Sequence, residues 1–376
     1  MYKVMTIVGT RPELIKMSRV IAEFDKFSNH LLVHTGQNYD FELNEVFFNN
    51  LNIRKPDYFL DASGKNSIQT ISKVISNVDV VIKKELPDAI LLYGDTNSCL
   101  SVISAKRNKI PVFHMEAGNR CFDERVPEEI NRKIVDHLSD INLVLTEHAR
   151  RYLIKEGLSQ EKIFKTGSHM PEVLNFYKKN ILSSHIINKL SLKKQEYFVV
   201  SVHREENVDD KENLKEIIHS IDEIFCKYKQ PIIISTHPRT EKKLKDFNLN
   251  IENEKIKFLK PLGFFDYVNL QLNARLIISD SGTITEEASI LNLPAITIRN
   301  THERPEGFDH GTLIMSGLKH NKILSSIDII LSQHNYSSQN FSLVDDYRED
   351  NVSSKILRIV FSYIEYVKKN VWKIDI

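Results

Sequence analysis

Acidic side chains, arginines and histidines are crowded together in residues 114–137, which read HMEAGNRCFDERVPEEINRKIVDH. The stretch begins at the end of an apolar, strand-like run, KIPVFHM. Carboxylates and imidazoles beside cations can transfer protons and stabilise developing charge. A solvated charged loop would give the same composition, so the choice depends on what the rest of the chain offers to the same site.

Similar groups follow the other apolar runs of the chain. Because the carboxyl ends of parallel strands lie at one edge of a sheet, we expect the residues just after each run to form a ligand site. The segments are GTRPELIK (9–16), HTGQNYD (34–40), GDTNS (94–98), VHREEN (202–207), THPRT (236–240) and SDSGTITEEA (279–288). This concentration of binding and proton-transferring groups favours a functional site over isolated charged loops.

GTRPELIK is typical of a turn from a strand into a helix. Gly9 permits a close turn, and Pro12 suits the first helical turn. The exposed helix N-terminus, together with Arg11 and Lys16, would bind an anion or a base. The alternative is a plain strand-to-helix turn with cations on its surface.

The segment SDSGTITEEA predicts a second anion site. Ser281, Gly282 and Thr283 place small side chains and free backbone N–H groups at a helix start, where the aligned amides would stabilise a diphosphate. One turn further on, Glu286 or Glu287 could accept hydrogen bonds from ribose hydroxyls. A well-capped helix with acidic residues near its positive end would explain the same residues.

Two further strand ends carry candidate acid–base groups. His203 and Arg204 follow the run EYFVVSV, and a histidine beside an arginine there can transfer a proton next to a phosphate. Asp95, in GDTNS, has an equally exposed position. The alternatives are a structural histidine and an aspartate that caps the following helix.

Strand-like and helical runs alternate along the chain, and the strands are apolar almost throughout. This pattern predicts an α/β fold with parallel sheets covered on both faces. The alternation pauses near residues 166–173 and begins again, so we expect two Rossmann-like doubly wound domains that face each other across a cleft. The expected domains are residues 1–167 and 168–354, with a C-terminal helix at 355–376 that joins the first. No G-x-G-x-x-G fingerprint follows the first strand, which argues against a bound dinucleotide.

The composition is that of an ordinary globular protein of 376 residues, with 41% hydrophobic and 27% charged residues. Lys and Arg total 51 against 50 Asp and Glu, which argues against a nucleic-acid or anionic-membrane surface. No stretch resembles a signal peptide or a bilayer span. The three cysteines lack paired or metal-ligand spacing. We therefore expect a cytosolic protein with no metal, membrane or nucleic acid as a partner.

The ordered motifs GTRPELIK, GDTNS, HMEAGNR, PEEINR, HREEN, SDSG with EEA, and ERPEG (303–307) point to a known family. From about residue 3 to residue 320, the chain resembles the non-hydrolysing UDP-N-acetylhexosamine 2-epimerases. The resemblance implies a GT-B-like fold, a UDP-acetamido sugar as substrate, a homodimer, and neither a metal nor a nicotinamide cofactor.

The resemblance also implies roles for individual residues. The groups that handle protons would be Asp95, Glu116, Glu128 and His203. The groups that bind UDP or balance the acidic centre would be Arg11, Lys16, Arg132, Arg204, Ser281, Gly282, Thr283, Glu287 and Arg304. The crowded stretch then has an explanation, because Arg132 lies one helical turn beyond Glu128 and would offset the negative charge of the cluster.

Two segments depart from the commonest pattern of the family. AGNRCFDERVP, between Glu116 and Glu128, resembles the branch that converts UDP-2-acetamido-2,6-dideoxy-L-talose to UDP-N-acetyl-L-fucosamine for capsule or O-antigen synthesis. The alternative is the interconversion of UDP-GlcNAc and UDP-ManNAc. Asp123, Glu124 and Arg125 in this loop would shape the sugar pocket. HTGQNYD replaces a segment linked to an activating second UDP-GlcNAc, so the resemblance does not extend to that regulatory site.

Inversion at carbon 2 of such a sugar is difficult because no carbonyl group lies next to that carbon. If UDP leaves carbon 1 while the carbon-2 proton is removed, a 2-acetamidoglycal forms, and UDP can return after protonation of the opposite face. This route needs acid–base groups on both faces of the ring, and cations or helix N-termini that hold UDP. The alternatives are a GT-B glycosyltransferase, a hydrolysing relative and a catalytically silent UDP-sugar sensor, and the retained acid–base set argues against the sensor.

The substitutions Asp95→Asn, Glu116→Gln, Glu128→Gln and His203→Asn are expected to leave folded proteins with severely reduced turnover. Removal of a general acid–base group should lower the rate about a hundredfold or more. Steady-state rates measure the loss, with circular dichroism as the control for folding. Near-wild-type rates in any two of these variants would contradict the assignment.

Overall fold

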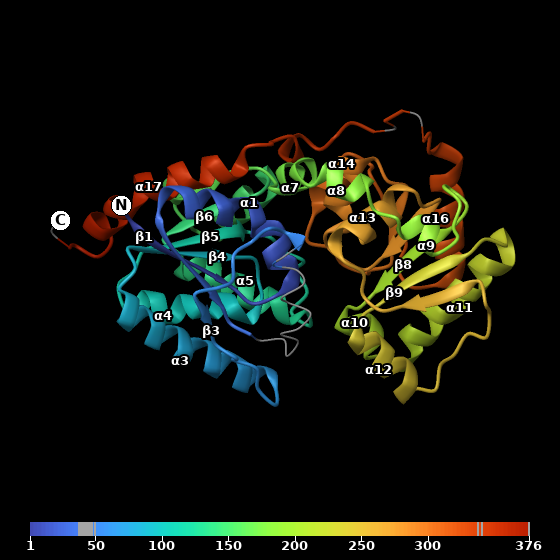
Figure 1. Cartoon of the computed structure of the whole chain (residues 1–376), viewed down its shortest axis with the longest axis horizontal. Coiled ribbons are helices and arrows are strands. Elements are labelled where there is room, and N and C mark those ends of the chain that lie inside the picture. Colours follow the sequence, from blue (N-terminus) through green and yellow to red (C-terminus); the bar gives the residue numbers. More distant parts are fainter. Residues whose placement is uncertain (37–47, 49, 337, 340, 375–376) are drawn as a thin grey trace. The chain divides into compact units, whose positions relative to one another are not determined.

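The computed structural model describes residues 1–36, 48, 50–336, 338–339 and 341–374. The chain forms two compact units, residues 1–173 with 349–376 and residues 174–348 (Figure 1). Each unit is built on a parallel sheet with helices against it, which confirms the predicted class of two doubly wound, GT-B-like α/β domains. The division falls between residues 173 and 174, against 167 and 168 in the expectation from sequence.

In the first unit, strands and helices alternate along the chain. Its strands are β1 (Lys3–Val8), β2 (Asn29–His34), β3 (Tyr58–Phe59), β4 (Ala89–Tyr93), β5 (Val112–Ala117), β6 (Ile141–Val144) and β7 (Ile163–Lys165). Its helices are α1 (Arg11–Phe27), α3 (Ser67–Glu85), η1 (Asn97–Ser101), α4 (Val102–Arg107), α5 (Pro127–Leu138), α6 (Glu147–Lys155), η2 (Gln160–Lys162) and α17 (Val352–Asn370). The helix α7 (Met170–Phe176) spans the division between the units.

Among the described residues, the first sheet has seven strands in the order β3-β2-β1-β4-β5-β6-β7, and the pairs are parallel. β1 lies between β2 and β4, so the strand order reverses there. Doubly wound sheets bind ligands at this kind of switch point. Nearly every residue of β1, β4 and β5 is buried, which explains why these strands are apolar along most of their length.

Part of the core of this unit forms where the apolar faces of β1 and α3 pack together. Met5 and Ile7 of β1 share one hydrophobic cluster with Val74 and Val78 of α3. Strand residues two apart face the same side of a sheet, and helix residues four apart face the same side of a helix. Alternate residues of the strand therefore pack against every fourth residue of the helix.

The second unit repeats this plan with its own elements. Its strands are β8 (Phe198–Val202), β9 (Ile232–Thr236), β10 (Ile256–Leu259), β11 (Leu276–Ser279), β12 (Ala295–Thr297) and β13 (Ile314–Met315). Its helices are α8 (Lys178–Leu182), α9 (Ile186–Lys189), α10 (Glu205–Val208), α11 (Lys211–Tyr228), α12 (Pro238–Asp246), α13 (Phe264–Leu272), α14 (Ile284–Leu291), α15 (Pro305–Asp309), α16 (His320–Gln333) and η3 (Asp345–Tyr347).

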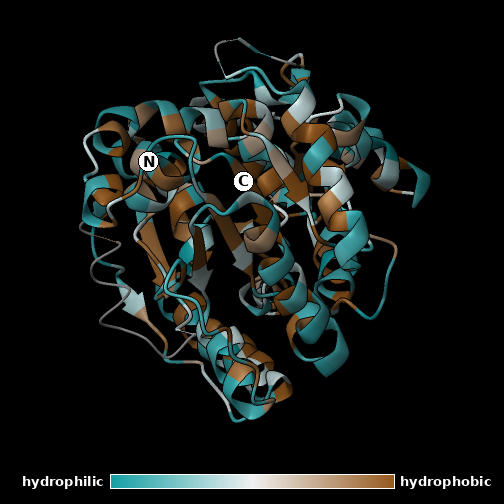
Figure 2. Cartoon of the chain, turned by 90° about the vertical axis from the view of Figure 1, so that its right-hand side faces the viewer, coloured by the Kyte–Doolittle hydropathy of each residue, from teal (hydrophilic) through white to brown (hydrophobic). Residues whose placement is uncertain are grey.

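Within the described ranges, the second sheet has six parallel strands in the order β10-β9-β8-β11-β12-β13, and its switch point lies between β8 and β11. Successive residues of β8 enter different clusters. Val200 packs with residues of α11 and α16, whereas Val199 packs with residues of α13 and α14. Both faces of this sheet are therefore covered. Figure 2 shows the same layering, with strands largely in the hydrophobic colour and helices that carry a hydrophilic side.

The helix α17 returns the end of the chain to the first unit. Ser354 Oγ donates a hydrogen bond to Glu23 of α1 at 2.9 Å, and Lys368 Nζ donates to Asp88 at 2.6 Å. The expected C-terminal helix, at residues 355–376, is thus found at Val352–Asn370. Neither α17 nor another helix in the described part of the chain is both long enough and apolar enough to cross a membrane.

Ile364 of α17 is fully buried, so Ile364→Ala is expected to lower the free energy of unfolding by about 2–5 kcal/mol. Arg358→Ala, at an exposed position of the same helix, is the control and should change it by about 0.5 kcal/mol or less. Urea unfolding followed by circular dichroism measures both values. Equal effects would mean that α17 adds no apolar surface to the core.

Candidate active site

The predicted residues of the first unit lie at the carboxyl edge of its sheet. Arg11 opens α1 after β1, Asp95 follows β4, and Glu116 stands near the end of β5. Glu128 and Arg132 lie on the next helix, α5, where Glu128 is partly exposed and Arg132 is buried. Since β1, β4 and β5 are neighbours in the sheet, their carboxyl ends lie side by side.

Asp95 is paired with a buried arginine. Its Oδ2 atom accepts hydrogen bonds from Nε of Arg132 at 2.8 Å and from Nη2 at 2.7 Å. Nη1 of Arg132 donates to Glu129 at 2.9 Å, so this guanidinium balances both carboxylates. The alternative that Asp95 caps the following helix is wrong, because the side chain of Thr96 accepts the hydrogen bond from the Ser98 N–H.

Glu116 is held in an unusual backbone conformation. Its φ is 59°, and the pairing of β5 with β6 is irregular between Met115 and Ala117. A residue other than glycine in this left-handed region costs about 1–3 kcal/mol. Its Oε2 atom accepts hydrogen bonds from Lys16 Nζ at 2.9 Å and from the hydroxyl of Tyr93. Lys16, predicted to contact an anionic ligand, therefore pairs with a carboxylate of the protein itself in this structure.

A buried ion network supports the chain that follows Glu116. Asp136 of α5 accepts hydrogen bonds from Arg120 Nη1 at 2.7 Å and from the Gly118 N–H at 3.1 Å. Nδ1 of His114 lies 2.8 Å from the same carboxylate. Burial alone would raise the pKa of Asp136, but the hydrogen bonds and charges of His114 and Arg120 lower it below its ordinary value. The ionised carboxylate thereby fixes the turn directly after the predicted catalytic glutamate.

Two ion pairs of the 114–137 stretch involve side chains at the surface. Arg125 contacts Asp123 at 2.7 Å, and Lys133 contacts Glu124 at 2.7 Å. Exposed ion pairs add little to stability. The side chains of Glu124, Arg125 and Lys133 are therefore solvated, as the simpler interpretation held, whereas Arg120 and Cys121 of the same loop are buried.

Glu13 is a buried carboxylate next to the same site. Its Oε2 atom accepts hydrogen bonds from the N–H groups of Gly9 at 2.5 Å and Thr10 at 3.0 Å. Its Oε1 atom accepts one from Thr96 Oγ1 at 2.5 Å. Burial raises the pKa of Glu13 to about 7 and outweighs these hydrogen bonds, while the charge of Asp95 acts in the same direction as burial.

His203 and Arg204 lie at the switch point of the second sheet. They follow β8, and Asp280 follows the neighbouring strand β11. The buried carboxylate of Asp280 accepts hydrogen bonds from the backbone N–H groups of His203 at 3.0 Å and Arg204 at 2.9 Å. It also accepts one from the side chain of Asn207 at 3.0 Å. Asp280 therefore fixes the turn that carries the predicted histidine.

The environment of His203 favours its neutral form. Burial lowers its pKa below the ordinary value, and the guanidinium groups of Arg204 and Arg299 act in the same direction, while Asp280 opposes them. Nδ1 lies 3.2 Å from Asp280, and the side chain is still 36% exposed. At neutral pH this imidazole is therefore an uncharged, accessible group that can accept or donate a proton.

Arginines surround the buried carboxylate of Glu303. Nη1 of Arg299 donates a hydrogen bond to it at 2.6 Å, and Nη2 of Arg204 donates at 3.2 Å. Arg304, in the ERPEG motif, lies 3.6 Å from Glu303. Its Nε atom donates to Glu286 at 2.8 Å. Nη2 of Arg299 also lies 3.4 Å from Glu206, so each of these guanidinium groups lies against a carboxylate.

A small pocket lies beside the N-terminal end of the helix α14. Its lining residues are Ser281, Gly282, Thr285, Thr297, Arg299, His302, Glu303 and Arg304. A Cβ atom at Gly282 would lie 2.2 Å from a side-chain oxygen of Glu303, so a larger residue here would displace the Glu303 carboxylate. Guanidinium groups beside a helix start suit an anionic ligand, as the sequence predicts for this segment.

The other predicted residues of this segment make local contacts. The hydroxyls of Ser281 and Thr283 lie 2.9 Å apart, just before α14 begins. Glu287, predicted to contact ribose, is in the first turn of α14, and its Oε2 atom accepts a hydrogen bond from Gln271 at 2.7 Å. Its role toward a ligand stays a prediction.

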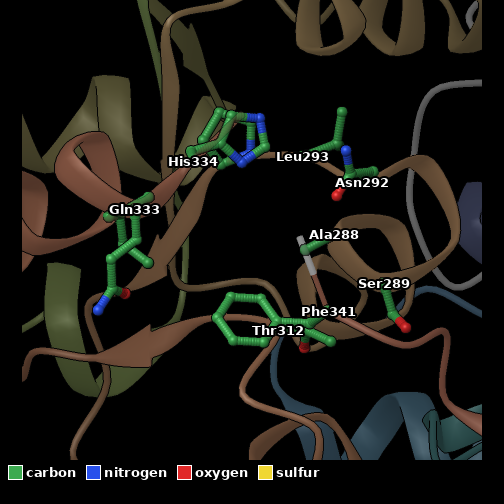
Figure 3. Close-up of a pocket in the computed structure, with 10 residues that line it drawn as sticks. Ala288, Ser289, Asn292, Leu293, Thr312, Gln333, His334 and Phe341 are labelled. Carbon is green, nitrogen blue, oxygen red and sulfur yellow. The ribbon is translucent and has the colours of Figure 1, made fainter. Parts of the chain in front are cut away.

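A second hollow of this unit shares no lining residue with the first (Figure 3). Its lining residues are Ala288, Ser289, Asn292, Leu293, Pro294, Thr312, Ile330, Gln333, His334 and Phe341. Ser289 Oγ accepts a hydrogen bond from the Val344 N–H at 3.1 Å, and Asn292 donates to the Ser338 carbonyl at 3.0 Å. These polar groups serve contacts within the chain, and the predicted site residues lie elsewhere.

Most of the segment HTGQNYD lies outside the described residues. His34 and Thr35 are buried, and Thr35 Oγ1 lies 2.8 Å from Ser98 Oγ. Residues 37–40 are not described, so the interpretation of this segment as a departure from the family's regulatory site stays a prediction.

Sequence analysis did not single out several residues that hold the site together. Asp136 lies four residues after Arg132 on one helix, and this spacing could have indicated a shared face. Asp280 and Glu303 lie inside quoted motifs, but nothing in the sequence names their partners. Nothing in the sequence indicated a role for Tyr93, because it is the last residue of the apolar run AILLY.

Comparison with known proteins gives a consistent result. The family described as UDP-N-acetylglucosamine 2-epimerase matches residues 22–361. The structure of UDP-N-acetylglucosamine 2-epimerase from Rickettsia bellii is 58% identical, covers 100% of both chains and has a TM-score of 0.93. The Methanococcus maripaludis UDP-N-acetylglucosamine 2-epimerase is 39% identical over 96% of this chain and 99% of its own. The Methanocaldococcus jannaschii UDP-GlcNAc 2-epimerase, in complex with UDP-GlcNAc and UDP, is 36% identical, covers 96% and 99%, and has a TM-score of 0.90.

The raised pKa of Glu13 predicts a pH dependence of stability. Because this pKa rises on folding from an ordinary 4.5 to about 7, the folded protein binds the proton more tightly than the unfolded chain does. The stabilisation from this group is fully present below pH 4.5 and is lost as the pH rises to about 7. The free energy of unfolding should fall by on the order of 3 kcal/mol over this range.

Glu13→Gln keeps the shape of the side chain and removes its titration. The free energy of unfolding of the wild type, relative to this variant, should therefore fall between about pH 5 and about pH 8. Glu161→Gln, at an exposed position, is the control and should show no such trend. A pH-independent difference between wild type and Glu13→Gln would contradict the assignment.

Proposed function

This chain belongs to the UDP-N-acetylglucosamine 2-epimerase family, and we propose that it interconverts UDP-N-acetylglucosamine and UDP-N-acetylmannosamine by inverting carbon 2 of the sugar. Like the relatives of that name, it is an isomerase of the non-hydrolysing type. The names of the similar proteins support this sugar pair more than the L-talose and L-fucosamine pair expected from the loop after Glu116. The proposed enzyme is a cytosolic homodimer that uses neither a metal nor a nicotinamide cofactor.

The observation that carries this proposal is the set of charge-compensated carboxylates at the edge of the first sheet. Asp95 lies against Arg132, and Glu116 lies against Lys16. A nearby cation favours the ionised form of a carboxylate, which is the form that accepts a proton. Carboxylates at neighbouring strand ends are the acid–base groups that epimerisation without a carbonyl group needs.

The second unit offers groups suited to a departing nucleotide. Arg204, Arg299 and Arg304 bring positive charge to the segment around Gly282, just before α14. The free N–H groups of a helix start and guanidinium groups both stabilise the charge that a diphosphate gains when it leaves carbon 1. His203 is uncharged at neutral pH and can exchange a proton with that phosphate.

The proposed reaction balances without an external reagent. A base takes the carbon-2 proton, a carbon 1–carbon 2 double bond forms, and the bond from carbon 1 to UDP breaks with its electron pair on the departing oxygen. Protonation of carbon 2 on the opposite face and renewed attack of UDP on carbon 1 give the epimer. No net oxidation occurs, so the route needs no hydride acceptor.

A second candidate sugar is UDP-2-acetamido-2,6-dideoxy-L-talose. The observation that favours it is the loop between Glu116 and Glu128, where Phe122 is 70% exposed and the Arg125 side chain is 84% exposed. The whole segment AGNRCFDERVP stands where the commonest family members have a segment with aromatic and serine-proline residues. The chemistry at carbon 2 is the same for both sugars, so this candidate concerns specificity alone.

Incubation of the purified protein with each UDP-sugar in deuterated water, followed by NMR, tests the proposal. We expect deuterium at carbon 2 of UDP-N-acetylglucosamine and UDP-N-acetylmannosamine, with UDP still attached, since the proton that returns comes from solvent. Faster exchange with the 6-deoxy sugar would assign the second candidate.

Matched variants separate catalysis from folding in this assay. Asp95→Asn should slow the exchange about a hundredfold or more. Asp345→Asn changes an aspartate whose side chain is 82% exposed and should leave it unchanged. Release of free sugar would instead indicate hydrolysis, release of UDP only with an acceptor would indicate a transferase, and either result would overturn the proposal.

A further inference from the structure

Tyr93 is a polar residue at the edge of the first sheet that the proposed mechanism leaves unused. It is the last residue of β4, is 3% exposed, and pairs with Met115 of β5 in the sheet register. That register places it beside Glu116, the next residue of β5. A buried phenol needs a hydrogen-bond partner, and a carboxylate is a strong one.

The contacts of Tyr93 converge on one oxygen atom. Its hydroxyl hydrogen-bonds Oε2 of Glu116, the same atom that lies 2.9 Å from Lys16 Nζ. The Lys16 ammonium also lies 5.5 Å from the centre of the Tyr93 ring. The side chains of Lys16 and Glu116 are 7% and 9% exposed. A phenol and an ammonium group therefore act together on a carboxylate that water hardly reaches.

Other carboxylates lie in the same region as Glu116. Burial, together with the charges of Glu13, Asp95 and Glu116, raises the pKa of the Cys99 thiol, so these carboxylates lie around one buried side chain. Like charges at such a site favour protonation of one member. Lys16, on α1, and the Tyr93 hydroxyl, on β4, contact Glu116 and favour its ionised form over the protonated form.

We propose that Tyr93 is a positioning residue that, together with Lys16, holds Glu116 as a carboxylate ready to accept a proton. Its part in catalysis rests on the proposed function, whereas the bond between Tyr93 and Glu116 does not. Glu116 is then the group that starts a turnover as a base, and one of the other acid–base groups delivers a proton to the opposite face. The phenol and the ammonium group also restrain the position of Oε2, because both donate hydrogen bonds to that oxygen.

The variant Tyr93→Phe isolates the hydroxyl. It keeps the ring that lies near Lys16 and the edge contact with His169, whose ring centre is 5.1 Å away. Tyr197→Phe is the matched control, because Tyr197 is also buried and its hydroxyl donates only to a described backbone carbonyl, that of Leu270, at 2.6 Å. Both variants lose one buried hydrogen bond, but only the first loses a bond to a carboxylate.

The direct test is titration of Glu116 by NMR in protein with carbon-13 in the glutamate carboxyl groups. The signal is assigned by its disappearance in Glu116→Gln. In the wild type we expect a midpoint below the ordinary glutamate value. In Tyr93→Phe the midpoint should rise by about one to two pH units, since a hydrogen bond to the charged form is lost. Equal midpoints in the two proteins would overturn the proposal.

The pH profile of deuterium exchange gives the functional readout. In Tyr93→Phe the acid limb of kcat should move to higher pH by a similar amount, so that the loss of rate is larger at low pH, whereas Tyr197→Phe should keep the wild-type profile. A uniform loss at every pH would mean a structural role only. If Tyr93→Phe does not fold, a wild-type midpoint at or above the ordinary glutamate value still refutes the proposal. If the wild type exchanges no deuterium, the proposed function fails, while the titration still decides whether Tyr93 holds Glu116.

Discussion

Three carboxylates at the edge of the first sheet are each paired with a cation. Asp95 has Arg132, Glu116 has Lys16, and Asp136 has Arg120. An unpaired buried charge would cost several kcal/mol, so removal of one partner affects more than its own contact. The parallel sheet imposes this condition, because it brings the polar ends of successive strands to one edge.

The second unit meets the same condition in a different way. Its switch point is organised by one buried aspartate, Asp280, which binds backbone N–H groups in place of a cation. Around Glu303, guanidinium groups and carboxylates are interleaved. Arg204 and Arg299 contact Glu303, while Arg299 also contacts Glu206 and Arg304 contacts Glu286. An edge of this kind suits an anionic ligand, whereas the edge of the first unit suits the transfer of protons.

Much of this could be predicted from sequence, because local patterns determine it. Apolar runs separated by helical periods predicted the parallel sheets, and the residues after each run predicted the two edges. The choice of partner could not be predicted in this way. Lys16 and Glu116 are 100 residues apart, and their contact depends on the register of strands that pair through the backbone. Tyr93 was missed for the same reason, since a strand-ending tyrosine looks apolar until its neighbour is known. The expected roles of the individual site residues toward a ligand remain predictions.

The backbone at Glu116 has a further consequence. Its left-handed conformation is one that glycine adopts freely and glutamate adopts under strain. Glycine at this position would relieve the backbone strain, but it would also remove the carboxylate that lies against the buried ammonium group of Lys16. At Glu116 the conformational preference of the backbone therefore opposes the need for a carboxylate in the proposed reaction.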